Sequence, residues 1–193
     1  KEKELDNTDI ITTYLCPKCH QYTIKSHEGQ GKECPSCYTK DSLNTTNIKE
    51  GVSEIQLNEI YNLMDVYCHP FTSGGQEIPV QEAKLAELVT LVTNYSCGED
   101  SCVPESGGLP LDWAEYREPG TQFIKASTDA NSICDQLTKV YEMDLTQRAS
   151  MGAQARDFVL KNYSIEVVGK FFEDLFDELP LIDWSQIDLT PKP

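Results

Sequence analysis

Beyond residue 50 the chain alternates between two hydrophobic patterns, one typical of helices and one typical of buried strands. Helices are predicted over 53–64, which opens on a Ser-Glu-Ile-Gln capping box, and over 79–88, which opens on a proline. Short apolar or β-branched runs predict strands at 66–68, 89–93 and 123–126. The first four of these elements therefore alternate along the chain.

The last third of the chain has the pattern of three consecutive amphipathic helices. The first is predicted to start at Thr128 or Asp129, the second to be capped by Thr146 and the third by Ser164. The third carries the most regular apolar stripe in the sequence, and Pro180 stops it. Strands that alternate with helices of this length predict an α/β fold, with a Rossmann-like parallel sheet flanked by helices.

Composition and charge narrow the classes of partner. The chain has 193 residues, with 16 lysines and arginines against 32 acidic residues, which gives a formal charge of −16. Nucleic acid and anionic membranes repel so acidic a chain, so nucleic acid is not an expected partner. No apolar run approaches the roughly 18 residues of a membrane span. No secretory leader is visible either, so a cytoplasmic location is predicted.

Four of the eight cysteines form two Cys-x-x-Cys pairs with a spacer long enough for a short hairpin. Two residues between cysteines let one tight turn aim both sulfurs at one point, and two facing turns make a tetrahedral thiolate site. The spacing predicts a zinc ribbon whose ligands are Cys16, Cys19, Cys34 and Cys37. A site closed by four thiolates contributes folding energy and no catalysis, so the zinc is expected to be structural.

Other interpretations of these cysteines stay open. A redox pair or two disulfides are alternatives, although disulfides are uncommon in a chain without a secretory signal. His20 or His27 can replace one thiolate as a ligand. The ribbon is mildly basic and carries Tyr22 and Tyr38, but it lacks the clustered basic stripe of a nucleic-acid site. Residues 26–31 fit the tip of the hairpin.

A second candidate site follows the predicted strand at 66–68. Parallel sheets bind ligands beyond the carboxyl ends of their strands, and the polar turn 72–77 lies between that strand and the next helix. Gly74 and Gly75 allow close backbone approach, and the helix dipole favours negative charge. From this physics alone, an anion site and a plain strand-to-helix turn are equally good interpretations.

Sequence motifs in the order expected of one family extend roughly over 51–179. Within 57–83, a helix ending in tyrosine and aspartate leads to a strand, a His-Pro dipeptide, a glycine turn and a helix with Glu-Ala. Gly-Thr-Gln-Phe-Ile at 120–124, an Arg-Ala-Ser-Met-Gly run from 148 and Asn-Tyr-Ser at 162–164 follow. The whole resembles the nucleotide-sugar-binding half of retaining glycosyltransferases with a GT-B fold, the family 4-like group 1 transferases.

The resemblance implies a hexosyltransferase that moves a sugar from a nucleoside diphosphate sugar to an acceptor without a metal. In the family, the glutamate matched by Glu82 holds the ribose hydroxyls, and the turn before it contacts the sugar and diphosphate. The implied substrate-binding residues are Ser73, Gly74, Gly75, Gln76, Glu77, Ile78 and Glu82. The family's other glutamate falls on Gly74, and its arginine–lysine pair has no counterpart in 1–50, so no catalytic residue is assigned.

The predicted domain organisation combines the cysteine motif with the glycosyltransferase-like segment. Residues 1–12 and 45–180 are expected to form the donor-binding domain, 13–44 the zinc-ribbon insertion and 181–193 a C-terminal tail. The family's acceptor-binding amino-terminal domain is missing from this chain, which opens on Lys1. The expected function is therefore that of a glycosyltransferase donor-binding domain that does not turn over alone. The alternative is a non-catalytic, zinc-stabilised interaction module on a glycosyltransferase-like scaffold.

Overall fold

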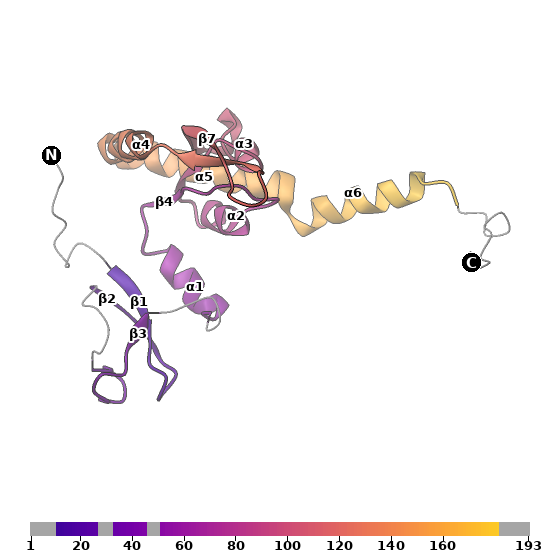
Figure 1. The fold of residues 1–193 in the computed structure, drawn as a ribbon. Coiled ribbons are helices and arrows are strands. Elements are labelled where there is room, and N and C mark those ends of the chain that lie inside the picture. The colour runs from indigo at the N-terminus through magenta and orange to yellow at the C-terminus, as the bar shows by residue number, and fades with distance from the viewer. Residues whose placement is uncertain (1–10, 27–32, 46–50, 182–193) are drawn as a thin grey trace. The chain divides into compact units, whose positions relative to one another are not determined.

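The computed structural model of the chain describes residues 11–26, 33–45 and 51–181 (Figure 1). Two compact units follow one another in the sequence, Lys1–Glu59 and Ile60–Pro193. Most of the hairpin tip predicted at 26–31 lies outside the described residues, as does almost all of the tail predicted at 181–193.

The first unit contains an antiparallel sheet of three strands in the order β2-β1-β3. These strands are β1 (Ile11–Leu15), β2 (Tyr22–Ser26) and β3 (Asn44–Thr45). β1 pairs with β2 along its whole length, so Ile11 already belongs to the sheet of the cysteine unit. A small core forms beside the sheet, and its buried members are Tyr14, Cys16, Cys34 and Leu43.

Helix α1 (Glu54–Tyr61) begins with the predicted capping box. The Gln56 amide donates to Ser53 Oγ at 3.3 Å, and the Ser53 amide donates to Gln56 Oε1 at 3.0 Å. These bonds satisfy backbone donors that no helical carbonyl reaches. The start of the predicted helix is therefore confirmed, and its end comes earlier than residue 64.

A parallel sheet of three strands in the order β4-β5-β6 forms the centre of the second unit. Helix α2 connects the first two strands, and α3 with a 3-10 turn, η2, connects the last two. The elements are β4 (Val66–His69), α2 (Ile78–Leu85), β5 (Val89–Thr93), α3 (Gly98–Ser101), η2 (Pro104–Ser106) and β6 (Gly108–Leu111). All five residues of β5 are buried, as expected of a central strand covered on both faces.

The chain continues through an antiparallel hairpin into three helices. The hairpin consists of β7 (Trp113–Arg117) and β8 (Ile124–Thr128). The helices are α4 (Ala130–Glu142), α5 (Leu145–Tyr163) and α6 (Ile165–Glu178). The α/β class and a parallel sheet flanked by helices are thus confirmed, while the Rossmann-like and GT-B topology stays a prediction.

Two of the three predicted helix caps are present, and one is wrong. Asp129 accepts a bond from the Asn131 amide at 2.9 Å, and Ser164 caps α6. Helix α5 is capped by Asp144, whose carboxylate accepts from the Gln147 amide at 2.8 Å, and Thr146 does not cap it. The preference for Asp144 has a physical reason, because the Gln147 side chain bonds back to the Asp144 amide and completes a capping box.

The core of the second unit joins the sheet to the helices that follow it. Val89 and Leu91 of β5, Leu111 of β6 and Val140 of α4 are buried together, with Met151 of α5 packed against them. By contrast, α6 has no buried residue. No helix of the described residues is long and apolar enough to cross a membrane.

Candidate functional site

The four cysteines of the two Cys-x-x-Cys pairs converge on one point. Their sulfur atoms all lie within 4.8 Å of one another. Cys16 Sγ and Cys37 Sγ are 3.7 Å apart, and Cys19 Sγ and Cys34 Sγ are 3.6 Å apart. None of the four forms a disulfide. The predicted convergence is confirmed, and the group can hold a metal ion.

Both pairs use the same tight turn. The His20 amide donates to the Cys16 carbonyl at 2.8 Å, and the Tyr38 amide donates to the Cys34 carbonyl at 2.9 Å. His20 and Tyr38 share a φ of 57°, a left-handed conformation that few residues other than glycine adopt. Among the described residues the metal-binding group contains cysteines only, so His20 is no ligand there, and His27 lies outside them.

Neighbouring hydroxyls favour the thiolate form of two of the four cysteines, whereas burial and the adjacent thiols raise the pKa of Cys19. The Ser42 hydroxyl, 3.4 Å from Cys16 Sγ, lowers the pKa of that thiol to about 6. The Thr39 hydroxyl, 3.3 Å from Cys37 Sγ, likewise lowers the pKa of Cys37. Metal ligation requires deprotonated cysteines, and thiolates in a core beside the fully buried Tyr14 need a positive charge to compensate them. A bound metal cation would supply that charge.

The second candidate site lies at the carboxyl end of β4. Hydrogen bonds from distant parts of the second unit hold its turn in place. The Ala126 amide of β8 donates to the Thr72 carbonyl at 2.8 Å, and Ser96 Oγ donates to the Gly74 carbonyl at 2.8 Å. These bonds therefore hold the turn in a fixed conformation, in which Gly75 is exposed.

The Glu77 side chain points back to the end of β4. Glu77 directly precedes α2 but makes no capping bond with its side chain. Its Oε2 instead lies 2.9 Å from His69 Nε2, and the Tyr67 hydroxyl lies 3.2 Å from His69 Nδ1. The histidine tautomer with a proton on Nε2 satisfies both bonds, because Nδ1 then accepts from tyrosine and Nε2 donates to the carboxylate.

Gly74 leaves the space that this carboxylate occupies. A Cβ atom at position 74 would collide with Glu77 Oε1, and it would lie 3.5 Å from Cys97 Sγ. The absence of a side chain at 74 therefore permits the bond between Glu77 and His69. The structure thus brings together two of the predicted site residues, Gly74 and Glu77.

Glu82, one turn further along α2, is bonded to a residue outside the predicted set. Tyr61 is 7% exposed, and its hydroxyl donates to Glu82 Oε2 at 3.0 Å. Burial, with Glu82 beside it, raises the pKa of Tyr61 far above its usual value. The Tyr61 ring packs 5.8 Å from the Tyr67 ring, which stacks 5.6 Å from the His69 ring. A continuous row of aromatic rings thus links the two carboxylates.

Sequence reasoning did not find this row, although one signal was available. Tyr67 and His69 alternate along the predicted strand at 66–68 and its end, so they share one face of the sheet. Of the other predicted sugar-site residues, Ser73, Gly75, Gln76 and Ile78 are exposed.

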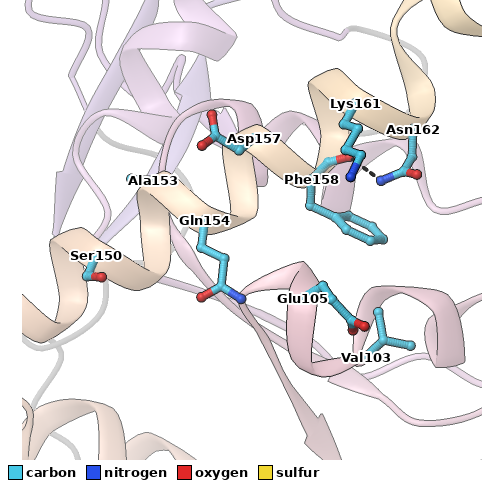
Figure 2. Close-up of a pocket in the computed structure, with 9 residues that line it drawn as sticks. All are labelled: Val103, Glu105, Ser150, Ala153, Gln154, Asp157, Phe158, Lys161 and Asn162. Carbon is cyan, nitrogen blue, oxygen red and sulfur yellow. Dashed lines mark hydrogen bonds between the residues drawn. The ribbon is translucent and has the colours of Figure 1, made fainter.

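A cavity of about 690 Å³ lies elsewhere in the second unit (Figure 2). Its lining comes from α5 and from the segment around η2, with Gln154 reaching the Pro104 carbonyl at 2.7 Å. Because η2 directly precedes β6, this cavity lies at the amino end of that strand, opposite the edge where parallel sheets bind ligands. Neither it nor cavities of about 440 and 470 Å³ include a predicted sugar-site residue.

No protein-family model, no curated protein and no solved structure matches this chain. The assignment of a function therefore depends on the sequence motifs and on the geometry of the two candidate sites.

Proposed function

We propose that this chain is the donor-binding part of a glycosyltransferase, and that residues 73–78 with Glu82 receive a nucleoside diphosphate sugar. One observation carries the proposal. The Glu77 carboxylate lies over Gly74, at the carboxyl end of β4. That edge of a parallel sheet is where such ligands bind.

The position of Glu77 offers a substitute for a missing group. The resembling family has a glutamate at the position of Gly74, and that glutamate grips the transferred sugar. In this chain a carboxylate reaches the same space from Glu77, with His69 orienting it. An ionised carboxylate is a strong acceptor for sugar hydroxyls, and Glu82, oriented by Tyr61, is suited to the ribose hydroxyls.

The charges around the turn favour binding without turnover. In the described part of the chain, no ion pair joins a lysine or arginine to Glu77 or Glu82. Lys84 of α2 is fully buried and donates to the carbonyls of Ser101 and Ser106. A departing diphosphate needs cations or well-aimed amides, so a partner domain would have to supply the cations.

Calorimetric titration of the full chain with UDP-, GDP- and ADP-glucose tests this function. We expect saturable binding of one of them, weakened about tenfold or more by Glu82→Gln or Glu77→Gln, which corresponds to about 1.4 kcal/mol. Glu99→Gln, an exposed glutamate of α3, is the matched control and should leave binding unchanged. The proposal would be rejected if none of the three sugars binds, or if both variants bind as tightly as the wild-type chain.

We also propose that the metal of the cysteine cluster is zinc. Four sulfurs at zinc–sulfur distances of 2.3 Å form a tetrahedron with edges of about 3.8 Å. Two of the sulfur separations, 3.6 and 3.7 Å, come close to that value, and all four sulfurs lie within 4.8 Å of one another. Elemental analysis of the purified chain should give one zinc per molecule, lost in Cys34→Ser and kept in Cys134→Ser, which alters an exposed cysteine. Iron in place of zinc would contradict this assignment.

The shortage of cations near the turn favours one other function. A zinc-stabilised interaction module would bind its partner through exposed groups of the first unit, such as Tyr38, which is 74% exposed. It predicts that no nucleotide sugar binds and that Glu82→Gln has no effect. The titration described above separates the two functions.

A further inference from the structure

Two aromatic side chains meet just beyond the carboxyl ends of β5 and β6. Tyr95 is the second residue after β5, and Trp113 is the first residue of β7. Their ring centroids are 4.6 Å apart, with an angle of 53° between the ring planes. Both side chains are half-buried. Neither belongs to the predicted sugar site.

Backbone carbonyls hold the polar ends of both rings. The Tyr95 hydroxyl donates to the Ile124 carbonyl at 3.0 Å, and Trp113 Nε1 donates to the Asn94 carbonyl at 2.6 Å. With these donors engaged, each ring has a fixed orientation and offers a ligand its apolar surface. Rigid aromatic groups of this kind lose little conformational entropy when a ligand binds.

A polar residue directly precedes each of the two aromatic residues in the sequence. Thr93 and Leu111 are partners in the parallel register, and the Asn94 amide continues it by donating to the Leu111 carbonyl at 3.0 Å. Asn94 and Asp112, the residues that come next on the two strands, are both exposed. Asn94 and Asp112 thus place an amide and a carboxylate at the same edge of the sheet as the ring pair, each one residue before an aromatic residue.

We propose that Tyr95 and Trp113 form the stacking platform of a saccharide site, with Asn94 and Asp112 as hydrogen-bond partners for its hydroxyls. A pyranose ring has an apolar face of C–H groups, which packs on aromatic rings, and a rim of hydroxyls, which bonds to amides and carboxylates. A neutral saccharide is also the ligand that Asp112 and a chain of charge −16 do not repel.

The platform lies next to the proposed donor site. Ser96, the neighbour of Tyr95, bonds the Gly74 carbonyl through its hydroxyl. The inference builds on the proposed function only in naming a saccharide as the acceptor. The site itself requires neither a nucleotide nor Glu82.

Fluorescence of Trp113 tests the site. The chain has two tryptophans, so Trp184→Phe leaves Trp113 as the only one. We expect at least one neutral trisaccharide among maltotriose, mannotriose and chitotriose to change its emission saturably. Tyr95→Ala should weaken that binding at least tenfold. Tyr116→Ala, which alters a half-buried tyrosine on the opposite face of β7, should leave it unchanged.

Additional variants keep the test decisive. Asp112→Asn and Asn94→Ala change exposed side chains, so they should fold normally and still weaken binding if the site is correct. The same fluorescence titration with uncharged nucleosides tests the competing ligand class. Saturable binding of nucleosides without binding of any trisaccharide would overturn the inference. It would also be overturned if no trisaccharide saturates, or if Tyr95→Ala folds and binds equally well.

Failure of the saccharide site and failure of the proposed donor site can be distinguished experimentally. Glu82→Gln should leave trisaccharide binding unchanged, and Trp113→Ala, measured by calorimetry, should leave nucleotide-sugar binding unchanged. Trisaccharide binding without nucleotide-sugar binding would reject the proposed function and support this inference. Nucleotide-sugar binding without trisaccharide binding would support the proposed function and reject this inference.

Discussion

His69 Nε2 and Glu77 Oε2 lie 2.9 Å apart, where β4 ends and α2 begins. Because Glu77 directs its carboxylate to the histidine, α2 starts without a side-chain cap on its first amides. Capping bonds of this kind contribute about 1 kcal/mol to stability. The chain thus forgoes helix stabilisation at this position and gains an oriented carboxylate at the edge of the sheet.

Substitution of Gly74 should displace that carboxylate. In Gly74→Ala the new methyl group takes the place of Glu77 Oε1, so the bond to His69 breaks. We expect a loss of about 1 kcal/mol in the free energy of unfolding, measured by urea denaturation. In a Glu77→Ala background the same substitution should cost much less, because nothing remains to collide with.

Gly75 provides the control for this prediction. A Cβ atom at position 75 has nothing within 4 Å, so Gly75→Ala should leave stability nearly unchanged. Equal effects of the two alanine substitutions would contradict the described geometry.

Lys84 should make stability rise with pH. Burial lowers its pKa from 10.5 to about 8 in the folded chain. Between those values the unfolded chain binds the proton more strongly, so raising the pH through this window favours folding, by about 3 kcal/mol in total. Its two carbonyl acceptors match the two N–H groups of a neutral amine, so both bonds persist when the proton is lost.

The measurement compares the wild-type chain with Lys84→Met by urea denaturation from pH 7 to pH 9.5. The difference between them isolates lysine from the thiols and tyrosines that also titrate there. We expect the stability of the wild-type chain to rise relative to Lys84→Met over this range. Parallel pH profiles would show that the amine is not buried as described.

Removal of the metal should unfold the first unit and spare the second. The cysteine cluster is a large part of the core of the first unit, whereas the second has its own core around Leu91. Addition of a chelator should abolish amide exchange protection in the strands of Ile11–Ser26 while β5 remains protected. Simultaneous loss of both would indicate that one unit depends on the other.

The capping box of α5 offers a test at a site remote from both candidate sites. Asp144→Ala removes the bond to the Gln147 amide and should cost about 1 kcal/mol in the free energy of unfolding. Thr146→Ala, two residues away on the same helix, should change stability by only a few tenths of that value, because Thr146 is exposed. Urea denaturation of both variants checks the assignment.

The sequence predicted best those features that depend on local spacing. Two residues between cysteines constrain the turn by covalent geometry, and the β-branched run at 89–93 has few alternatives to a buried strand. The start of α5 was missed because Asp144 and Thr146 both fit a cap, and only the Gln147 side chain decides between them. Strand β6 was missed because it contains Gly108 and Pro110, which a sheet tolerates mainly at an edge.

The candidate site required more than spacing. Glu77 and Glu82 were identified as candidates by the resemblance of their segment to a glycosyltransferase motif. The direction of the Glu77 carboxylate depends on His69, and that of Glu82 depends on Tyr61, each on another element. Such side-chain directions follow from tertiary packing, so a pattern read along one chain does not specify them.

Helix α6 should determine the solubility of the purified protein. Its apolar side chains meet water, with Phe171 and Phe176 each more than 60% exposed. An exposed apolar surface of this extent promotes self-association at high concentration, and a 14-residue helix with no buried side chain is only marginally stable in water. A shortened version ending after Ser164 should therefore stay monomeric at concentrations where the longer form precipitates, which makes it the better starting material for crystals and spectroscopy.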